Sequence, residues 1–255
     1  MLEQELKSQS STTKSTDANQ TEFESSKWLA YFLENKNSQV VPRLKDDFDL
    51  GQELKKPLIH SLKRFQIGET GDGLHLKRYA KTVADKDYIE CVDLFVKEEQ
   101  GHAQNLASVI LALDGTLLTW HWSDLAFIGL RRILGLKTEL LILLIAEVIG
   151  KCFYKLVAAN SNSEELEEVF SLIVLDELMH LEFHTEFLVS RLGNYPSLVR
   201  SAIYHIWCGL FVLACFAFVA DHRQGLRALD SSMKKFFAES RSQFAKYAKR
   251  ACGLN

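Results

Sequence analysis

Residues Asp176–His180 have the sequence DELMH and lie inside a long predicted helix over residues 163–192. Glu177 and His180 are three residues apart, so on a helix their side chains point the same way, about one turn from each other. A carboxylate and an imidazole in this arrangement can bind one metal ion from the core side of the helix. The stretch therefore predicts half of a metal site.

A second copy of the pattern occurs earlier, in Glu98–His102, with the sequence EEQGH. It lies in a helix predicted over residues 86–113, with Asp85 as its N-cap. In both copies the motif glutamate follows another acidic residue. Two such pairs in a chain with few helix breakers favour a helical bundle that holds two metal ions between four helices.

The composition is that of a globular protein with one core, because 47% of the 255 residues are hydrophobic and 25% are charged. Only three prolines occur, and apolar residues recur at spacings of three and four, so we expect an all-α fold. A single domain is predicted over residues 27–255, with a bundle core at about 57–193 and a C-terminal helical extension at 197–250. Residues 1–26 are rich in Ser, Thr, Gln and Glu and are predicted to be a disordered tail.

Charge and cysteine content exclude several classes of protein. The net charge of -3 and the pI near 6.3 give no global basic field, which argues against nucleic acid as the main partner. The five cysteines are scattered and form no CxxC pair, so neither a disulfide framework nor a zinc site is indicated. The N-terminus lacks a basic-then-apolar signal pattern, and we expect a cytoplasmic protein.

Two further predicted helices each carry a single inward-facing glutamate. The first runs from Pro57 to about Val83, and its Glu69 is surrounded by three glycines. Each glycine costs about 1 kcal/mol in a helix interior relative to alanine, so close helix contact, a local bulge or room for a small molecule is expected there. The second helix covers residues 138–159, and Glu147 is the only charge in its apolar run. Such a carboxylate is rarely buried without a partner.

A long connection joins the two halves of the predicted bundle. It passes through Trp120 and Trp122, and a short helix is predicted from a cap at Ser123 to about Gly135. A connection of this length can cross the bundle instead of turning directly back.

The spacing of the glutamates places them at one level of the bundle. In an antiparallel helix hairpin, residues equally far from the turn lie side by side. Each lone glutamate is 30 residues from a motif glutamate, and the two midpoints are residue 84 and Asn162, both in predicted turns. The two pairs are Glu69 with Glu99 and Glu147 with Glu177. Two such hairpins packed together would gather four carboxylates and two imidazoles at one depth.

This order of residues resembles the ferritin-like di-iron carboxylate superfamily, in which Glu, Glu-x-x-His, Glu and Glu-x-x-His from four helices bind two iron ions. The resemblance covers about residues 57–193 and implies a four-helix bundle with a long crossover connection, extended here by two C-terminal helices. It implies six metal ligands: Glu69, Glu99, His102, Glu147, Glu177 and His180. Glu98 and Asp176 match positions that, in several oxygen-activating members, hold the ligand histidine of the opposite motif, with exposed helix charges as the alternative.

Alternatives stay open at several positions. Either Glu-x-x-His copy alone is typical of a solvated helix face, and Asp72, near the first lone glutamate, is an alternative to it as a ligand. His184 lies seven residues after Glu177 on the same face and is expected beside the ligands, either as a hydrogen-bonded core histidine or as an extra ligand or proton carrier. Tyr79 and Tyr154 are expected to pack at the core edge, with a redox role as the alternative.

Two more helices are predicted beyond Pro196. Residues 201–220 are almost continuously apolar and near the length that spans a bilayer, whereas residues 231–250 are amphipathic and basic. Polar and small residues interrupt the first helix, so we expect it to cover the bundle as a core helix or to form a homodimer interface, and not to enter a membrane. The polar sequence Asp221–Arg223 after it is interpreted as a lock onto the bundle.

The predicted function is dioxygen activation at two iron ions, with manganese as an alternative metal. An oxidase or oxygenase of this kind acts on a small-molecule substrate and needs an electron donor. The metals would carry the reaction, so no catalytic protein base is assigned, and the apolar inner stripes favour a hydrophobic substrate. The alternatives are a ferroxidase or iron-storage protein, a di-manganese catalase-like enzyme, and a metal-free helical interaction protein.

Overall fold

The computed structural model describes residues 22–38, 44–45, 48–119 and 135–254. All regular secondary structure in these ranges is helical, which confirms the all-α prediction. In chain order the helices are α2 (Ser25–Ser38), α3 (Gln52–Glu69), α4 (Leu74–Ala80), the 3-10 helix η1 (Lys81–Val83), α5 (Lys86–Ala112), α7 (Leu136–Asn160), α8 (Glu164–Leu192), α9 (Ser197–Asp221), α10 (Arg223–Ala228) and α11 (Met233–Ala251). The short helix predicted in the connection before α7 lies outside the described residues.

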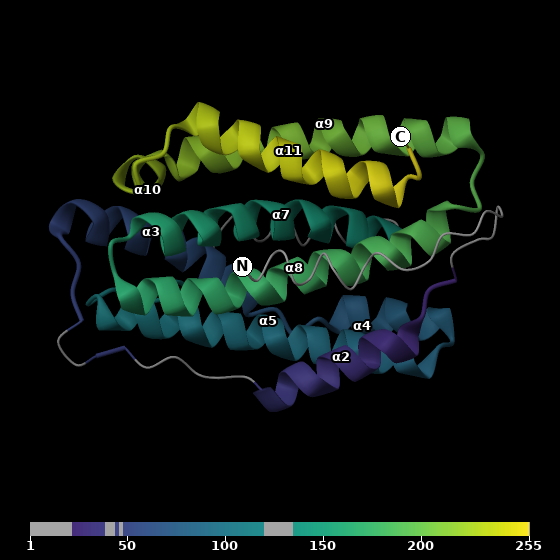
Figure 1. Cartoon of the computed structure of the whole chain (residues 1–255), viewed down its shortest axis with the longest axis horizontal. Helices are drawn as coiled ribbons and strands as arrows, with labels where there is room; N and C mark the ends of the chain where they lie inside the picture. The colour runs from purple at the N-terminus through teal and green to yellow at the C-terminus, as the bar shows by residue number, and fades with distance from the viewer. Residues whose placement is uncertain (1–21, 39–43, 46–47, 120–134, 255) are drawn as a thin grey trace, which may run out of the picture.

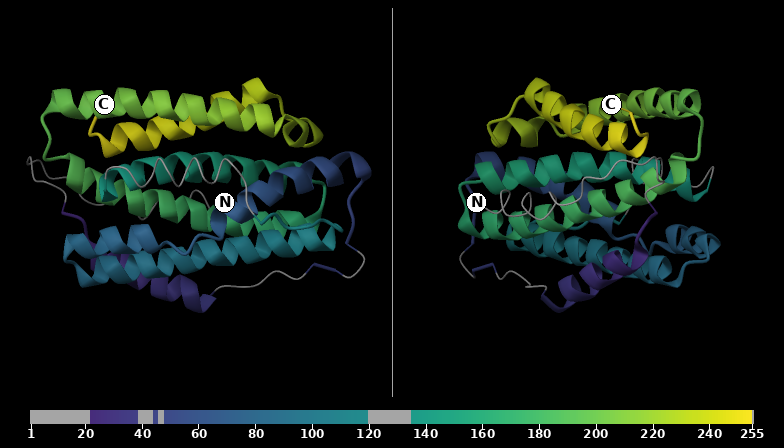
Figure 2. Two further views of the ribbon diagram at one scale, coloured as in Figure 1. Left: turned by 180° about the vertical axis from the view of Figure 1, so that it is seen from behind. Right: turned by 45° about the vertical axis from the view of Figure 1, so that its right-hand side comes forward.

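Four helices, α3, α5, α7 and α8, surround the core that holds the predicted site. α3 packs along α5, α7 packs along α8, and α5 also contacts α8. α3 reaches α7 through Phe65, whose ring centroid lies 5.1 Å from that of Phe153 and 5.0 Å from that of Tyr154. The helices α9 and α11 form a layer over α7 and α8, while α2 and α4 lie on the opposite side against α5 (Figures 1 and 2).

The chain reverses direction before α5 and before α8, at the two places that the sequence predicts. A carboxylate oxygen of Asp85 accepts a hydrogen bond from the backbone N–H three residues on, at 3.1 Å, and starts α5. The hydroxyl of Ser163 accepts the equivalent bond at 3.3 Å and starts α8. Just before these caps, Ala84 and Asn162 have φ angles of 59° and 54°. The predicted midpoint of each hairpin is therefore the residue at which the backbone reverses.

The continuous helix predicted over residues 57–83 is wrong. α3 begins earlier, at Gln52, and ends at Glu69, and a short loop then leads into α4 and η1. Gly73 in this loop has a φ of 63°, and a Cβ atom there would come within 2.5 Å of the Val96 side chain. Glycine is required at this position by the left-handed backbone and by the close approach of α5. The glycine-rich stretch thus marks a break between helices and not a strained helix interior.

The N-terminal boundary also differs from the predicted one. α2 begins at Ser25, inside the stretch of residues 1–26 that was expected to be disordered. The ring of Phe23 packs edge-on against Tyr88 and Phe187, with centroid distances of 5.7 and 5.3 Å. These aromatic contacts explain why the folded part starts earlier. The first 21 residues lie outside the described part of the chain.

α9 is fastened to the bundle along one side only. The indole N–H of Trp207 donates to the carbonyl oxygen of Leu141 at 2.7 Å, and Asp221 pairs with the Arg64 guanidinium at 2.6 Å. The second contact confirms the polar lock predicted after this helix. Within the described residues, α9 is the helix long and apolar enough to cross a membrane, yet only 22% of its most apolar window is buried. The prediction of a core helix therefore holds for one side of α9.

Candidate metal centre

Residues from three helices converge at the centre of the bundle. Glu99 of α5, Glu147 of α7, and Glu177 and His180 of α8 each place one ligand atom within 4.8 Å of the others. His102 of α5 adjoins this group, because its Nδ1 lies 3.5 Å from a carboxylate oxygen of Glu177 and 3.7 Å from one of Glu99. Five of the six residues expected as ligands therefore face one another.

The sixth expected ligand, Glu69, lies at the edge of the cluster. It is the last residue of α3 and is half-buried, and its Oε1 accepts a hydrogen bond from the Tyr154 hydroxyl at 2.9 Å. Burial and the nearby Glu99 and Glu177 carboxylates raise the pKa of Glu69 well above its usual value. The alternative ligand, Asp72, is exposed and instead accepts a hydrogen bond from the backbone N–H of Leu74.

The caps of α5 and α8 explain why both motifs point inward at the same level. Fourteen residues separate Asp85 from Glu99, and fourteen separate Ser163 from Glu177. Four turns of an α-helix contain about 14.4 residues, so each motif glutamate lies on the same side of its helix as its cap, four turns on. The histidine follows one turn later on that side.

The outward-facing nitrogen of each histidine is held by a carboxylate from the other motif. His180 Nε2 lies 2.8 Å from Oε2 of Glu98, and His102 Nε2 lies 3.1 Å from Oδ2 of Asp176. These are the pairs that the family resemblance implied. In both cases the Nδ1 atom is left to face the cluster, because the other ring nitrogen is already engaged. Outer carboxylates of this kind fix the tautomer and orientation of a metal-binding imidazole.

Asn35 joins the two outer carboxylates and was not predicted. Its side-chain amide nitrogen, on α2, lies 2.9 Å from Oε1 of Glu98 and 2.9 Å from Oδ1 of Asp176. One amide group can donate a hydrogen to each of them. Asn35 is 63 residues from one carboxylate and 141 from the other, so no local spacing in the sequence indicates the contact. A helix outside the four-helix core thus orders both halves of the site.

Several ligand atoms at the centre have no hydrogen bond within the described part of the chain. They are one carboxylate oxygen each of Glu99, Glu147 and Glu177 and the Nδ1 atoms of His102 and His180. His180 Nδ1 lies 2.9 Å from Glu99 Oε1, but in a direction that forms no hydrogen bond. Buried polar atoms without partners are rare because leaving each one unpaired costs about 1–3 kcal/mol. A group of them facing one point is the pattern expected of metal ligands.

The charges in the cluster are strongly coupled. Burial would raise the pKa of the Glu99 carboxyl, but the adjacent imidazole of His180 lowers it to about 2. Burial would lower the pKa of His180, but Glu98 and Glu99 raise it to about 10. The pKa of Glu147 is raised well above its usual value, by burial first and then by Glu99 and Glu177. Protons on some of these groups thus supply positive charge that a metal cation would otherwise supply.

Aromatic side chains enclose the histidine side of the cluster. Phe95 lies edge-on to the His180 ring at a centroid distance of 4.7 Å, and Phe32 of α2 stacks on the same ring at 6.3 Å. His184 is fully buried one turn after His180, with its ring 4.7 Å from that of Phe95, and it is not among the groups that converge at the centre. It is therefore a buried histidine packed among aromatic rings next to the cluster.

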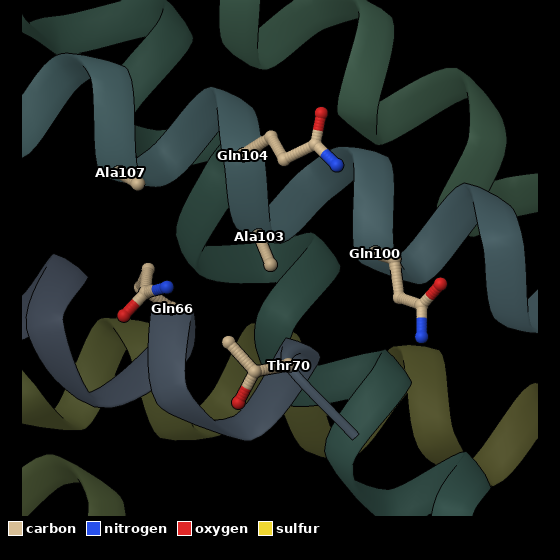
Figure 3. Close-up of a pocket in the computed structure, with 6 residues that line it drawn as sticks. All are labelled: Gln66, Thr70, Gln100, Ala103, Gln104 and Ala107. Atoms are coloured by element: carbon tan, nitrogen blue, oxygen red, sulfur yellow. The ribbon is translucent and has the colours of Figure 1, made fainter. Parts of the chain in front are cut away.

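A small pocket lies between the end of α3 and α5 (Figure 3). Its volume is about 290 Å³, and its lining is Gln66, Thr70, Gln100, Ala103, Gln104 and Ala107. Gln66 lies three residues before Glu69, and Ala103 lies four residues after Glu99, so the pocket is one helical turn from both. Its amide groups offer hydrogen bonds, which differs from the apolar surroundings expected for a substrate.

No known protein family, curated protein or solved structure matches this chain.

Proposed function

We propose that this chain is a binuclear metal protein of the ferritin-like di-iron carboxylate type, and that it activates dioxygen as an oxidase or oxygenase. One observation carries the proposal. The inner nitrogens of both motif histidines and the oxygens of three glutamates face one buried point without hydrogen bonds, while the outer histidine nitrogens are held by carboxylates. Polar groups on a solvent-exposed helix surface face water and do not converge on one buried point.

The charge and chemistry of the donors fit two divalent cations. The four glutamates expected as ligands carry four negative charges when ionised, and two divalent cations carry four positive ones. Carboxylate oxygens combined with imidazole nitrogens suit iron or manganese, and the cluster contains no thiolate that would favour zinc or copper. Two ferrous ions, when bound, would supply electrons for the reduction of dioxygen.

The chain itself would hold and shield this site. Asn35 and the two outer carboxylates keep the imidazoles oriented, and the Tyr154 hydroxyl fixes one oxygen of Glu69. Phe32 and Phe95 exclude water from the histidine side. The pocket between α3 and α5, lined by Gln66 and Thr70 on either side of Glu69 in the sequence, would receive a small substrate near the site.

Metal content tests the proposal directly. Protein loaded with ferrous iron without oxygen, and then exposed to air, should contain about two metal ions per chain and develop a new near-ultraviolet absorption band. Glu147→Gln should lose at least one of them. Glu139→Gln changes a buried carboxylate two turns earlier on α7 and should keep both. Equal metal content in the two variants would remove Glu147 from the site.

The same experiment separates the proposed enzyme from its alternatives. Oxidation of many ferrous ions per chain, by a large assembly and without added substrate, would indicate a ferroxidase or storage protein. A wild-type protein that binds no iron or manganese would leave a helical interaction protein.

A further inference from the structure

α9 presents a long apolar surface to solvent. Between Leu198 and Ala220, every exposed residue is uncharged, and His205 is the one polar side chain among them. The largest are Leu198, Ile206, Leu213 and Phe216, which are 80%, 67%, 70% and 68% exposed. They recur at helical spacing, so they form one stripe along the side of α9 that faces away from Trp207 and the bundle.

The size of this stripe is that of an interaction surface. Each of the four large side chains exposes on the order of 100 Å², so together they expose about 400 Å² before the smaller residues are added. The largest exposed apolar patch on a typical soluble monomer is about 300–600 Å² and is often functional, and this stripe reaches that size on one helix. The stripe is therefore the first place to look for a binding partner.

The charge of the same layer identifies the kind of partner. Residues 197–255 contain nine lysines and arginines and three aspartates and glutamates, a net charge of +6, so the rest of the chain carries -9. The exposed basic residues of α11 are Lys234, Lys235, Arg241, Lys246 and Lys249. Arg241 also lines a groove of about 740 Å³ between α9 and α11, next to the stripe. Apolar and basic surfaces thus lie side by side in one layer, shown at the top of Figure 1.

We propose that the layer formed by α9 and α11 binds the surface of an anionic lipid bilayer. The apolar stripe enters the boundary between headgroups and acyl chains, and the basic side chains of α11 contact the anionic headgroups. A second copy of the chain would bring two layers of charge +6 together, which disfavours a dimer through this face. The earlier expectation that the protein avoids membranes rested on polar interruptions in α9, and the structure shows one side of this helix to be uncharged and exposed.

The attachments of α9 define how it would meet the membrane. Trp207 donates a hydrogen bond to the carbonyl oxygen of Leu141 on α7, and Asp221 forms an ion pair with Arg64 of α3. These contacts hold one side of α9 on the protein along its length. The helix would therefore lie in the plane of the membrane surface and not cross it, and binding would be peripheral.

Flotation of the full chain with lipid vesicles tests the proposal. The protein should float with vesicles of equal parts phosphatidylglycerol and phosphatidylcholine, should not float with phosphatidylcholine alone, and should be released as salt is added. Leu213→Ser/Phe216→Ser should reduce binding about tenfold or more, and Lys246→Glu/Lys249→Glu should also weaken it. Leu111→Ser/Leu175→Ser changes two exposed leucines outside the layer and should bind as the wild type does. Unchanged circular dichroism and thermal midpoints establish that each variant is folded.

Three outcomes would overturn the proposal. The first is absence of binding to either vesicle. The second is a stable dimer in solution that Leu213→Ser/Phe216→Ser converts to a monomer without any vesicle binding, because the stripe would then be an interface between copies. The third is equal loss of vesicle binding in the stripe variant and in Leu111→Ser/Leu175→Ser. These results do not depend on metal content, so the proposal can fail without the proposed function failing.

Discussion

Substitution of Asn35 tests whether α2 has a part in metal binding. Its amide group is placed to donate to one oxygen each of Glu98 and Asp176, both at 2.9 Å, and these carboxylates hold the two motif histidines. Hydrogen bonds to charged groups contribute about 1.5–3 kcal/mol, and less where solvent reaches them, as it does at the half-buried Asn35. Loss of an outer partner of this kind typically lowers metal affinity by about 10–100-fold, or about 1.4–2.7 kcal/mol. We expect Asn35→Ala to weaken the binding of Mn²⁺ or Fe²⁺ by a factor in this range.

The dissociation constant can be measured by competition with a fluorescent chelator without oxygen. Asn37→Ala is the matched control, because Asn37 is exposed on the same helix two residues further on. Both variants should unfold at a similar temperature when metal-free, so that a difference in affinity reflects the site. If Asn35→Ala and Asn37→Ala bind metal equally well, the reasoning about α2 is wrong.

Three further predictions concern protonation and folding. In metal-free protein, burial would lower the pKa of His180 but its carboxylate partners raise it to about 10, so its stabilisation is complete below about pH 6.5 and is lost as the pH rises towards 10. Metal binding must displace the proton from His180, and this costs less free energy at higher pH. The rise in thermal midpoint on adding Mn²⁺ should therefore be larger at about pH 8.5 than at about pH 6.5. An equal or smaller rise at about pH 8.5 would contradict the pairing of His180 with its carboxylate partners. Gly73→Ala should lower the free energy of unfolding, measured in urea, by about 1–3 kcal/mol. Gly71→Ala is the control and should change this free energy little, because a Cβ there meets only a backbone oxygen at 4.0 Å. Ser163→Ala removes the N-cap of α8 and should lower the same quantity by about 1 kcal/mol, and no change would show that the cap is dispensable.

The helix pairs and the level of the cluster were predictable because they depend on local rules. Asp85 and Ser163 are favoured cap residues, and counting from these turns places each lone glutamate opposite a motif glutamate. The helix pairs and this level need only helical periodicity and two turns. The pairing of His180 with Glu98 was expected from the family resemblance and not from the turn counting, and the structure shows this contact.

Other features depend on contacts between distant parts of the chain, which periodicity does not encode. The break at Gly73 depends on the approach of Val96, and the role of Asn35 depends on where α2 packs. The exposed side of α9 was missed for a related reason. A helix that is apolar all round has no preferred face in its sequence, so only the packing of Trp207 and its neighbours reveals which side is covered.

The equal intervals from Asp85 to Glu99 and from Ser163 to Glu177 have a consequence for length changes. One inserted residue in either interval would rotate the glutamate by about 100° and aim it away from its partners. Inserting a full turn would restore the direction but shift the carboxylate by about 5 Å along the axis, beyond the reach of the opposite helix. Many side chains in these two intervals can therefore be substituted, but the number of residues in each interval has to stay the same for the glutamates to meet.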